Sequence, residues 1–61
     1  MKYKEFDTIR INNGIMKGEL GVILIAYREP QEAYEVEILD EKGNHKAQCV
    51  LRPSDLELII K

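Results

Sequence analysis

The chain has few of the residues that form disulfides, metal sites and catalytic centres. Its 61 residues include one cysteine, Cys49, and one histidine, His45. An intrachain disulfide is therefore excluded, and so is a zinc site built from several cysteines and histidines. A lone cysteine also suits a reducing compartment. The only serine or threonine side chains are Thr8 and Ser54, and we expect no metal, no cofactor and no enzymatic activity.

The one pair that resembles a nucleophile and its base is separated too far to act together. Cys49 follows His45 by four residues, which on a strand places the two side chains roughly 13 Å apart. A nucleophile and its base need to lie within about 3 Å. We therefore interpret Cys49 as a small buried apolar residue and His45 as a solvent-exposed one.

Long hydrophobic runs are also absent. No segment approaches the ~20 apolar residues of a membrane span, and Met1–Glu5 has no apolar signal core. These features predict a cytoplasmic protein with a single domain over residues 1–61. A chain of this length buries only about 60% of its unfolded surface, so close packing or self-association must support the core.

Charge is distributed unevenly along the chain, although the net charge is only −2. Residues 1–28 and 42–61 each carry a net charge of +2, whereas residues 29–41 carry a net charge of −6 and no basic group. An acidic block of this kind disfavours a phosphate backbone as its partner. Its members are Glu29, Glu32, Glu35, Glu37, Asp40 and Glu41.

Short apolar segments separated by turn residues predict an all-β protein. Their spacing of about 8–12 residues is typical of a small barrel, here a five-stranded SH3-like barrel with one 3₁₀ turn before the last strand. Proline presets the backbone of that turn, which we place at Arg52–Leu56. The predicted strands are Phe6–Ile11, Val22–Tyr27, Ala33–Leu39, His45–Leu51 and Glu57–Ile60.

Alternation within these strands predicts which side chains face the core. In the third strand Tyr34, Val36 and Ile38 share the inner face, while Glu35 and Glu37 face outward. The first strand leaves two choices open, because its inner face is formed either by Phe6 with Thr8 or by Ile9 with Ile11. In the fourth strand the inner set is Ala47, Cys49 and Leu51.

Gly18 and Gly21 stand three residues apart, directly before the most apolar strand. Gly18 suits a turn that needs a positive φ, and Gly21 suits a close approach between backbones. A phosphate-binding loop would require a following helix. Because a β-branched strand follows instead, we interpret both glycines as structural.

The strand Val22–Tyr27 is apolar on both faces, so its outer face needs a cover. That outer face is either Ile23, Ile25 and Tyr27 or Val22, Leu24 and Ala26. Coverage by Ile15, Met16 and Ile59–Ile60 is one interpretation. The other is a homodimer through this strand or its edge, for which we predict the interface residues Ile23, Ile25 and Tyr27.

Several segments together resemble the domain of unknown function 4926 family of short bacterial proteins. The similar segments are Phe6–Ile9, Lys17–Val22, Tyr27, Glu32–Ile38 and Leu51–Leu56. The resemblance extends over nearly the whole chain and implies a small SH3-like fold. It implies no settled activity, although members often look like antitoxins or immunity proteins.

The acidic block and this resemblance together predict a non-catalytic protein-binding module. Immunity proteins against nucleases often use an acidic surface that attracts a basic partner. We therefore expect the partner, a basic toxin domain, to contact Glu29, Glu32, Glu35, Glu37, Asp40 and Glu41.

Two other functions remain as alternatives. The stretch from Asp7 to Ile23 resembles a KOW motif, which implies nucleic-acid binding through Lys2, Lys4, Arg10, Lys17 and Arg28. The chain is also similar to the plasmid-borne dihydrofolate reductase, a small oligomeric enzyme. Of the pore strand of that enzyme, however, only Gln48 matches, and the chain has no tryptophan.

Overall fold

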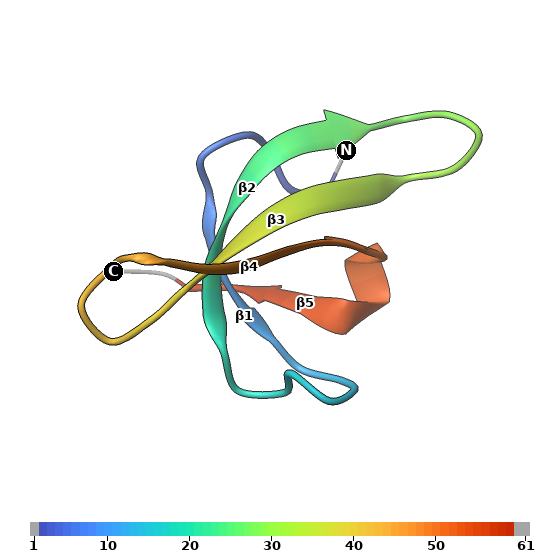
Figure 1. The fold of residues 1–61 in the computed structure, drawn as a ribbon. Helices are drawn as coiled ribbons and strands as arrows, with labels where there is room; N and C mark the ends of the chain where they lie inside the picture. Colours follow the sequence, from blue (N-terminus) through green and yellow to red (C-terminus); the bar gives the residue numbers. More distant parts are fainter. Residues whose placement is uncertain (1, 60–61) are drawn as a thin grey trace.

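A computed structural model describes residues 2–59 of the chain (Figure 1). Apart from one 3₁₀ turn, these residues contain no helix, and therefore none long and apolar enough to cross a membrane. The expected all-β class, the five strands and the 3₁₀ turn before the last strand are confirmed. The elements are β1 (Thr8–Ile11), β2 (Leu20–Tyr27), β3 (Ala33–Leu39), β4 (His45–Leu51), the 3₁₀ turn η1 (Pro53–Asp55) and β5 (Leu56–Leu58).

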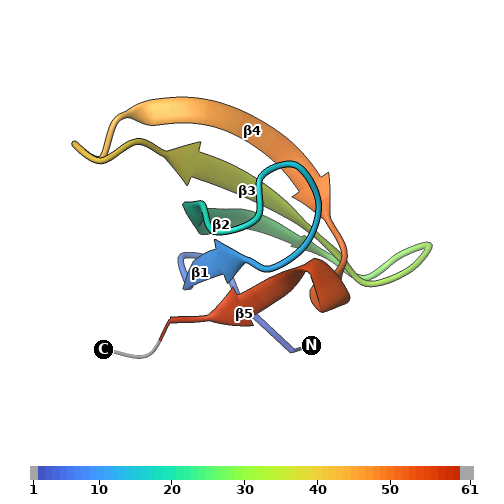
Figure 2. The ribbon, with the colours of Figure 1, turned by 90° about the horizontal axis from the view of Figure 1, so that it is seen from below.

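The strands form one antiparallel sheet in the order β4-β3-β2-β1-β5. Figure 2 shows β4 and β5 on opposite sides of this curved sheet, with β3, β2 and β1 between them. In residues 2–59 the two outermost strands pair with one neighbour each, so the sheet is open. β2 pairs with β3 from Gly21 to Tyr27 but with β1 only over residues 20–22. The predicted alternative of a homodimer through this strand or its edge stays a prediction.

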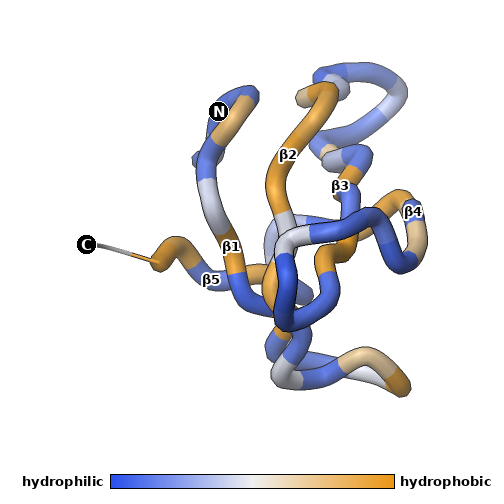
Figure 3. The backbone as a smooth tube through the Cα atoms, turned by 60° about the vertical axis from the view of Figure 1, so that its left-hand side comes forward, coloured by the Kyte–Doolittle hydropathy of each residue, from blue (hydrophilic) through white to orange (hydrophobic). Residues whose placement is uncertain are grey.

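β2 is apolar along most of its length (Figure 3), and a β-bulge explains how both of its faces can be apolar. Ile23 pairs with Val36, but the next residue of β3, Glu35, pairs with Ile25. Leu24 is thus an extra residue, and it reverses the alternation of the strand. Residues Gly21 and Ile23 face inward before the bulge, whereas Ile25 faces outward after it. A simple period of two could not describe both halves of the strand.

Gly21 allows β2 and β3 to approach closely. A Cβ atom at this position would lie 2.7 Å from the carbonyl oxygen of Glu37 and 2.7 Å from Cγ1 of Val36. Gly18 has the positive φ expected of a turn glycine, +94°. Both structural interpretations of these glycines are therefore confirmed.

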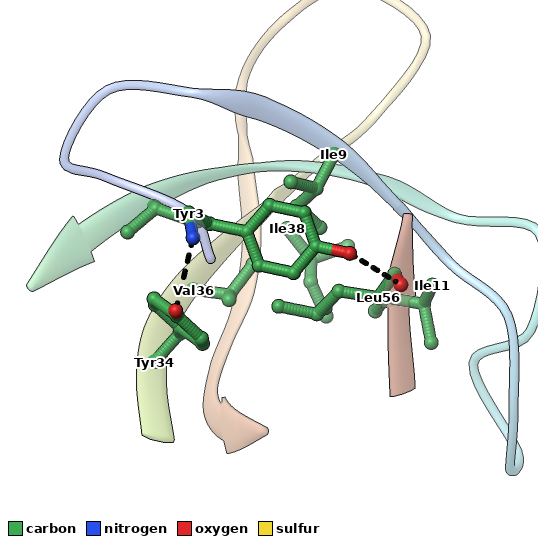
Figure 4. Packing of buried hydrophobic residues seen from close by; sticks show 8 residues of the cluster. Tyr3, Ile9, Ile11, Tyr34, Val36, Ile38 and Leu56 are labelled. Atoms are coloured by element: carbon green, nitrogen blue, oxygen red, sulfur yellow. Dashed lines mark hydrogen bonds between the residues drawn. The ribbon is translucent and has the colours of Figure 1, made fainter. Parts of the chain in front are cut away.

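The core lies on the inner face of the sheet and is closed by the N-terminal segment (Figure 4). Tyr3 is 6% exposed, and its ring meets that of Tyr34 edge-on, with centroids 5.4 Å apart. The backbone N–H of Tyr3 donates to the hydroxyl of Tyr34 over 3.0 Å, and the Tyr3 hydroxyl donates to the carbonyl of Leu56 over 3.0 Å. The buried residues are Tyr3, Ile9, Ile11, Ile23, Tyr34, Val36, Ile38 and Leu56.

The inner faces of three strands are now settled. In β1 the inward pair is Ile9 and Ile11, since both are buried. The inner set predicted for β3 is confirmed, and that of β4, Ala47, Cys49 and Leu51, packs against the core at its margin. Tyr3 was missed because two lysines surround it in the sequence and no alternation marks it.

Three strand boundaries and one packing prediction need correction, the first boundary being the start of β2 at Leu20 rather than Val22. β1 begins at Thr8 rather than Phe6, because Phe6 lies in a turn with φ +71° and is 76% exposed. β5 begins at Leu56 and ends at Leu58, whereas the predicted strand was Glu57–Ile60. Ile60 lies outside the described residues. Ile15 is fully exposed in the loop before β2 and covers nothing, whereas Met16 packs against the core.

Replacing Tyr3 tests how far the N-terminal segment stabilises the sheet. Tyr3→Ala should lower the free energy of unfolding by about 3–5 kcal/mol, since it empties an aromatic site in the core. Tyr3→Phe should cost about 1 kcal/mol, since it removes one hydrogen bond to a buried carbonyl. Urea denaturation measures both values, and the exposed Phe6→Ala serves as the control. A loss below that of Phe6→Ala would contradict a structural role for Tyr3.

Gly21→Ala tests the contact between β2 and β3. The added methyl meets backbone and side-chain atoms, so we expect a loss of about 1–3 kcal/mol through overpacking. Gly14→Ala is the matched control, because Gly14 has a positive φ but open space around it, and only the backbone cost of about 1 kcal/mol applies there. Equal stabilities of Gly21→Ala and the wild type would show that the strands can separate without cost.

Candidate functional site

Glu35 and Glu37 of β3 lie on the side of the sheet opposite the core. Their neighbours Tyr34, Val36 and Ile38 are fully buried, and successive side chains of a strand point to opposite faces. Both glutamates therefore point outward, as the sequence predicted. We call the surface around them the outer face, which consists of Ile25, Tyr27, Glu35, Glu37, Gln48 and Val50.

Strand register determines which side chains of the outer face are neighbours. Glu35 lies between Ile25 of β2 and Val50 of β4, which are 42% and 58% exposed. Glu37 lies between Val22 of β2 and Gln48 of β4. Directly paired residues on one face have Cβ atoms about 5 Å apart. Each carboxylate is thus bordered by an apolar side chain from β2.

Two donors hold the carboxylate of Glu35 in place. The hydroxyl of Tyr27 donates to Oε1 over 2.6 Å, and the side-chain amide of Gln48 donates to Oε2. These hydrogen bonds, that of Tyr27 first, lower the pKa of Glu35 below its ordinary value because they stabilise the charged form. The same contact raises the pKa of Tyr27. Glu35 is therefore an oriented anion at neutral pH.

Glu37 has a partner from the start of β4. Its Oε2 lies 2.9 Å from Nδ1 of His45, whose side chain is 55% exposed. His45 is exposed, as predicted, but it is also the neighbour that positions the second carboxylate. The two glutamates of the outer face are thus each held by a side chain of β4.

Glu32 does not belong to the outer face. It accepts hydrogen bonds from the hydroxyl of Tyr34 and, over 3.1 Å, from the backbone N–H of Lys2. Both bonds lower the pKa of Glu32, and that of Tyr34 has the larger effect. Burial is the main cause of the raised pKa of Tyr34. Glu32 therefore anchors the N-terminal segment at one end of the core.

The other three acidic residues lie in the loops at the two ends of β3. Asp40 uses Oδ1 to accept the backbone N–H groups of Lys42 and Asn44, both over 2.9 Å, and so shapes the β3–β4 loop. Glu29 and Glu41 are exposed. Because β3 has seven residues, about 20 Å of strand separates its two ends. The six predicted residues thus do not form one surface, and only Glu35 and Glu37 share the outer face.

The predicted oligomer interface of Ile23, Ile25 and Tyr27 does not form one face. Ile23 is fully buried, because it precedes the bulge at Leu24. Its assignment to an exposed interface is therefore wrong. Ile25 and Tyr27 do lie on the outer face, where Tyr27 contacts Glu35.

The five basic residues predicted for nucleic-acid binding are spread over the fold. Lys4 and Arg28 line one shallow hollow beside Phe6. Lys2 lies near this hollow, with its Nζ 5.6 Å from the centroid of the Tyr3 ring. Arg10 belongs to β1 and Lys17 to the loop before β2. No single element presents all five.

The described residues offer little for nucleophilic or metal chemistry. No group of three or more histidine, cysteine and acidic side chains within residues 2–59 is arranged to hold a metal ion. Cys49 packs against the core, and its burial raises the pKa of the thiol, with a smaller effect from Glu35. A thiol that stays protonated is a poor nucleophile.

The contacts of three members of the outer face with Glu35 could not be recognised from the sequence. Tyr27 and Gln48 contact Glu35 only because the bulge and the β3–β4 register bring them there. Val50 follows the inward-facing Cys49, so the alternation of the strand indicated that Val50 is exposed. Nothing in the local sequence indicated its position beside Glu35.

An open antiparallel sheet with a buried inner face and an acidic outer face defines a small all-β protein. Residues 5–58 match the family described as Domain of unknown function (DUF4926), and the chain belongs to this family. No curated protein and no solved structure matches the chain at a significant level.

The pKa of Glu35 gives a direct test of the outer-face geometry. Tyr27→Phe should raise it toward the ordinary value of a glutamate, because the strongest donor is lost. A lowered pKa stabilises the fold above the ordinary pKa and loses this contribution as the pH falls through the folded-state value. Stability of the variant should therefore fall less on acidification than that of the wild type.

Carboxyl NMR titration and urea denaturation at neutral and acidic pH provide the two measurements. Tyr3→Phe, which removes a hydroxyl that does not contact Glu35, is the control and should leave the titration of Glu35 unchanged. An identical titration of Glu35 in Tyr27→Phe would contradict the geometry.

Proposed function

We propose that this protein is a non-catalytic protein-binding module whose outer face docks a basic partner. The observation that carries the proposal is the pair of oriented carboxylates, Glu35 and Glu37, at the centre of that face. Each oxygen of a carboxylate accepts more than one hydrogen bond. Glu35 therefore retains acceptor capacity for an arginine or lysine of the partner after binding Tyr27 and Gln48.

Preorganisation makes these carboxylates better suited to binding than ordinary surface glutamates. A flexible side chain loses about 0.5–1.5 kcal/mol of conformational freedom when an interface immobilises it. Hydrogen bonds from Tyr27 and His45 already restrict Glu35 and Glu37 in the free protein. Charge-assisted hydrogen bonds to such oriented acceptors are the stronger kind.

Exposed apolar side chains accompany the charges. Ile25 and Val50 border Glu35 on both sides, and a protein interface combines buried apolar contacts with polar ones. Glu29 and Glu41 lie in the loops at either end of β3 and extend the negative potential, which accelerates association with a basic partner. These features support a partner of the kind that an antitoxin or immunity protein binds.

A finer description of the fold belongs to the same proposal. Five short antiparallel strands in the order β4-β3-β2-β1-β5, with a 3₁₀ turn before β5, support an SH3-like barrel. In that arrangement the outer face is a side wall of the barrel.

Charge removal on the outer face tests the function. The wild-type chain is used to capture partners from the cell that encodes it, and the captured protein is then purified for titration calorimetry. Glu35→Gln/Glu37→Gln should weaken its affinity by at least about tenfold, because two oriented charges are lost. Affinity of the wild type should fall as salt is added, and the variant should show a smaller dependence.

The matched control is Glu5→Gln/Glu57→Gln, which removes two exposed charges from other parts of the fold. It should retain the wild-type affinity. Equal affinities and salt dependences for the two double variants would refute the proposed role of the outer face.

A further inference from the structure

β4 leaves one of its two edges without a partner. It lies at the end of the sheet and pairs only with β3. In the described part of the chain, the backbone groups of His45–Leu51 make no hydrogen bond outside the β3–β4 ladder. The strand has seven residues and contains neither proline nor glycine. Such an edge is a template for another strand.

Protection of this edge is confined to one end. A bulge places Lys46 as an extra residue between the pairs Ile38–Ala47 and Leu39–His45, and bulges and lysines are common protections of an edge. The opposite half has no such device. Val50 is 58% exposed there, and Cys49 and Leu51 are only half-buried.

The side chains of β4 are complementary to a second copy of the same strand. In an antiparallel pair centred on Gln48, Gln48 faces its own copy, Ala47 faces Cys49, and Lys46 faces Val50. A residue on a two-fold axis must be able to bind itself, and a glutamine amide both donates and accepts. Ala47 and Cys49 both belong to the inner face, so their pairing keeps that face continuous. The bulge at Lys46 limits the ladder, because it places His45 beside Glu37 on the outer face.

Charge favours this register over its neighbour. In the Gln48-centred pair, Lys46, whose Nζ lies 3.0 Å from Oε2 of Glu19 in its own chain, stands opposite the uncharged Val50. Centring the pair on Cys49 would instead place Lys46 opposite Arg52, and directly opposed like charges are destabilising.

We propose that two copies of this chain associate through antiparallel pairing of their β4 strands, centred on Gln48, into a continuous sheet. The dimer carries two outer faces on one surface and extends the inner face beside Cys49. It replaces the earlier prediction of an interface through Ile23, Ile25 and Tyr27, and it does not depend on the proposed protein partner.

Sedimentation equilibrium of the full chain between about 1 and 200 µM tests the association by mass action. The average mass should rise from 7.1 kDa toward twice that value. Val50→Lys should raise the dimer dissociation constant by at least about tenfold, because it opposes Lys46 of the other copy. Ile25→Lys is the control, since Ile25 is similarly exposed on the outer face but belongs to an interior strand.

Cross-linking tests the register independently. In a Cys49→Ala background, Gln48→Cys should form an intermolecular disulfide, because its two copies lie directly opposite, within about 6 Å between Cα atoms. Val50→Cys should not, since the two copies of residue 50 are offset along the strands. A monomer at every concentration, a dimer disrupted only by Ile25→Lys, or faster cross-linking at residue 50 would each overturn the proposal.

Discussion

Burial of Tyr34 beneath Tyr3 is the interaction on which the rest of this fold depends. A sheet of five short strands leaves its inner face open, and a core of so few residues cannot lose a large member. Tyr3 covers that face and bonds to both β3 and β5, through the hydroxyl of Tyr34 and the carbonyl of Leu56. The strands β3 and β5 are thereby connected by a single residue from outside the sheet, through its backbone N–H and its side-chain hydroxyl.

Once Tyr34 is buried, the alternation of β3 determines which of its side chains point to the outer face. Tyr34, Val36 and Ile38 must point inward together, so Glu35 and Glu37 must point outward. A one-residue slip would bury both carboxylates, at a cost far greater than the stability of a small domain. The register of the core and the position of the acidic pair are therefore one constraint, and a variant that disturbs Tyr3 affects both.

The parts of this structure that depend on local patterns could be predicted from the sequence. The alternation of β3, the turn at Gly18 and the 3₁₀ turn at Pro53 are local features, and each is confirmed. Tyr3 and the apolar strand β2 could not be predicted in the same way. The contacts of Tyr3 span 31 and 53 residues, and the alternation of β2 is reversed by a bulge that the sequence does not mark. The candidate site was predicted in part, since the charges of β3 were recognised but their donors were not.

The bulge at Leu24 connects the fold with the proposed function. If β2 alternated regularly, without the bulge, Ile25 and Tyr27 would face inward with Ile23, where Tyr34 and Val36 already occupy the space. With it, Ala26 takes the inner position opposite Tyr34, and Tyr27 reaches the outer face to donate to Glu35. The bulge thus determines both that the small Ala26 faces the core and that Tyr27 orients the carboxylate of Glu35. The orientation of the acidic face therefore depends on a local irregularity of β2 as much as on the charged residues of β3 themselves.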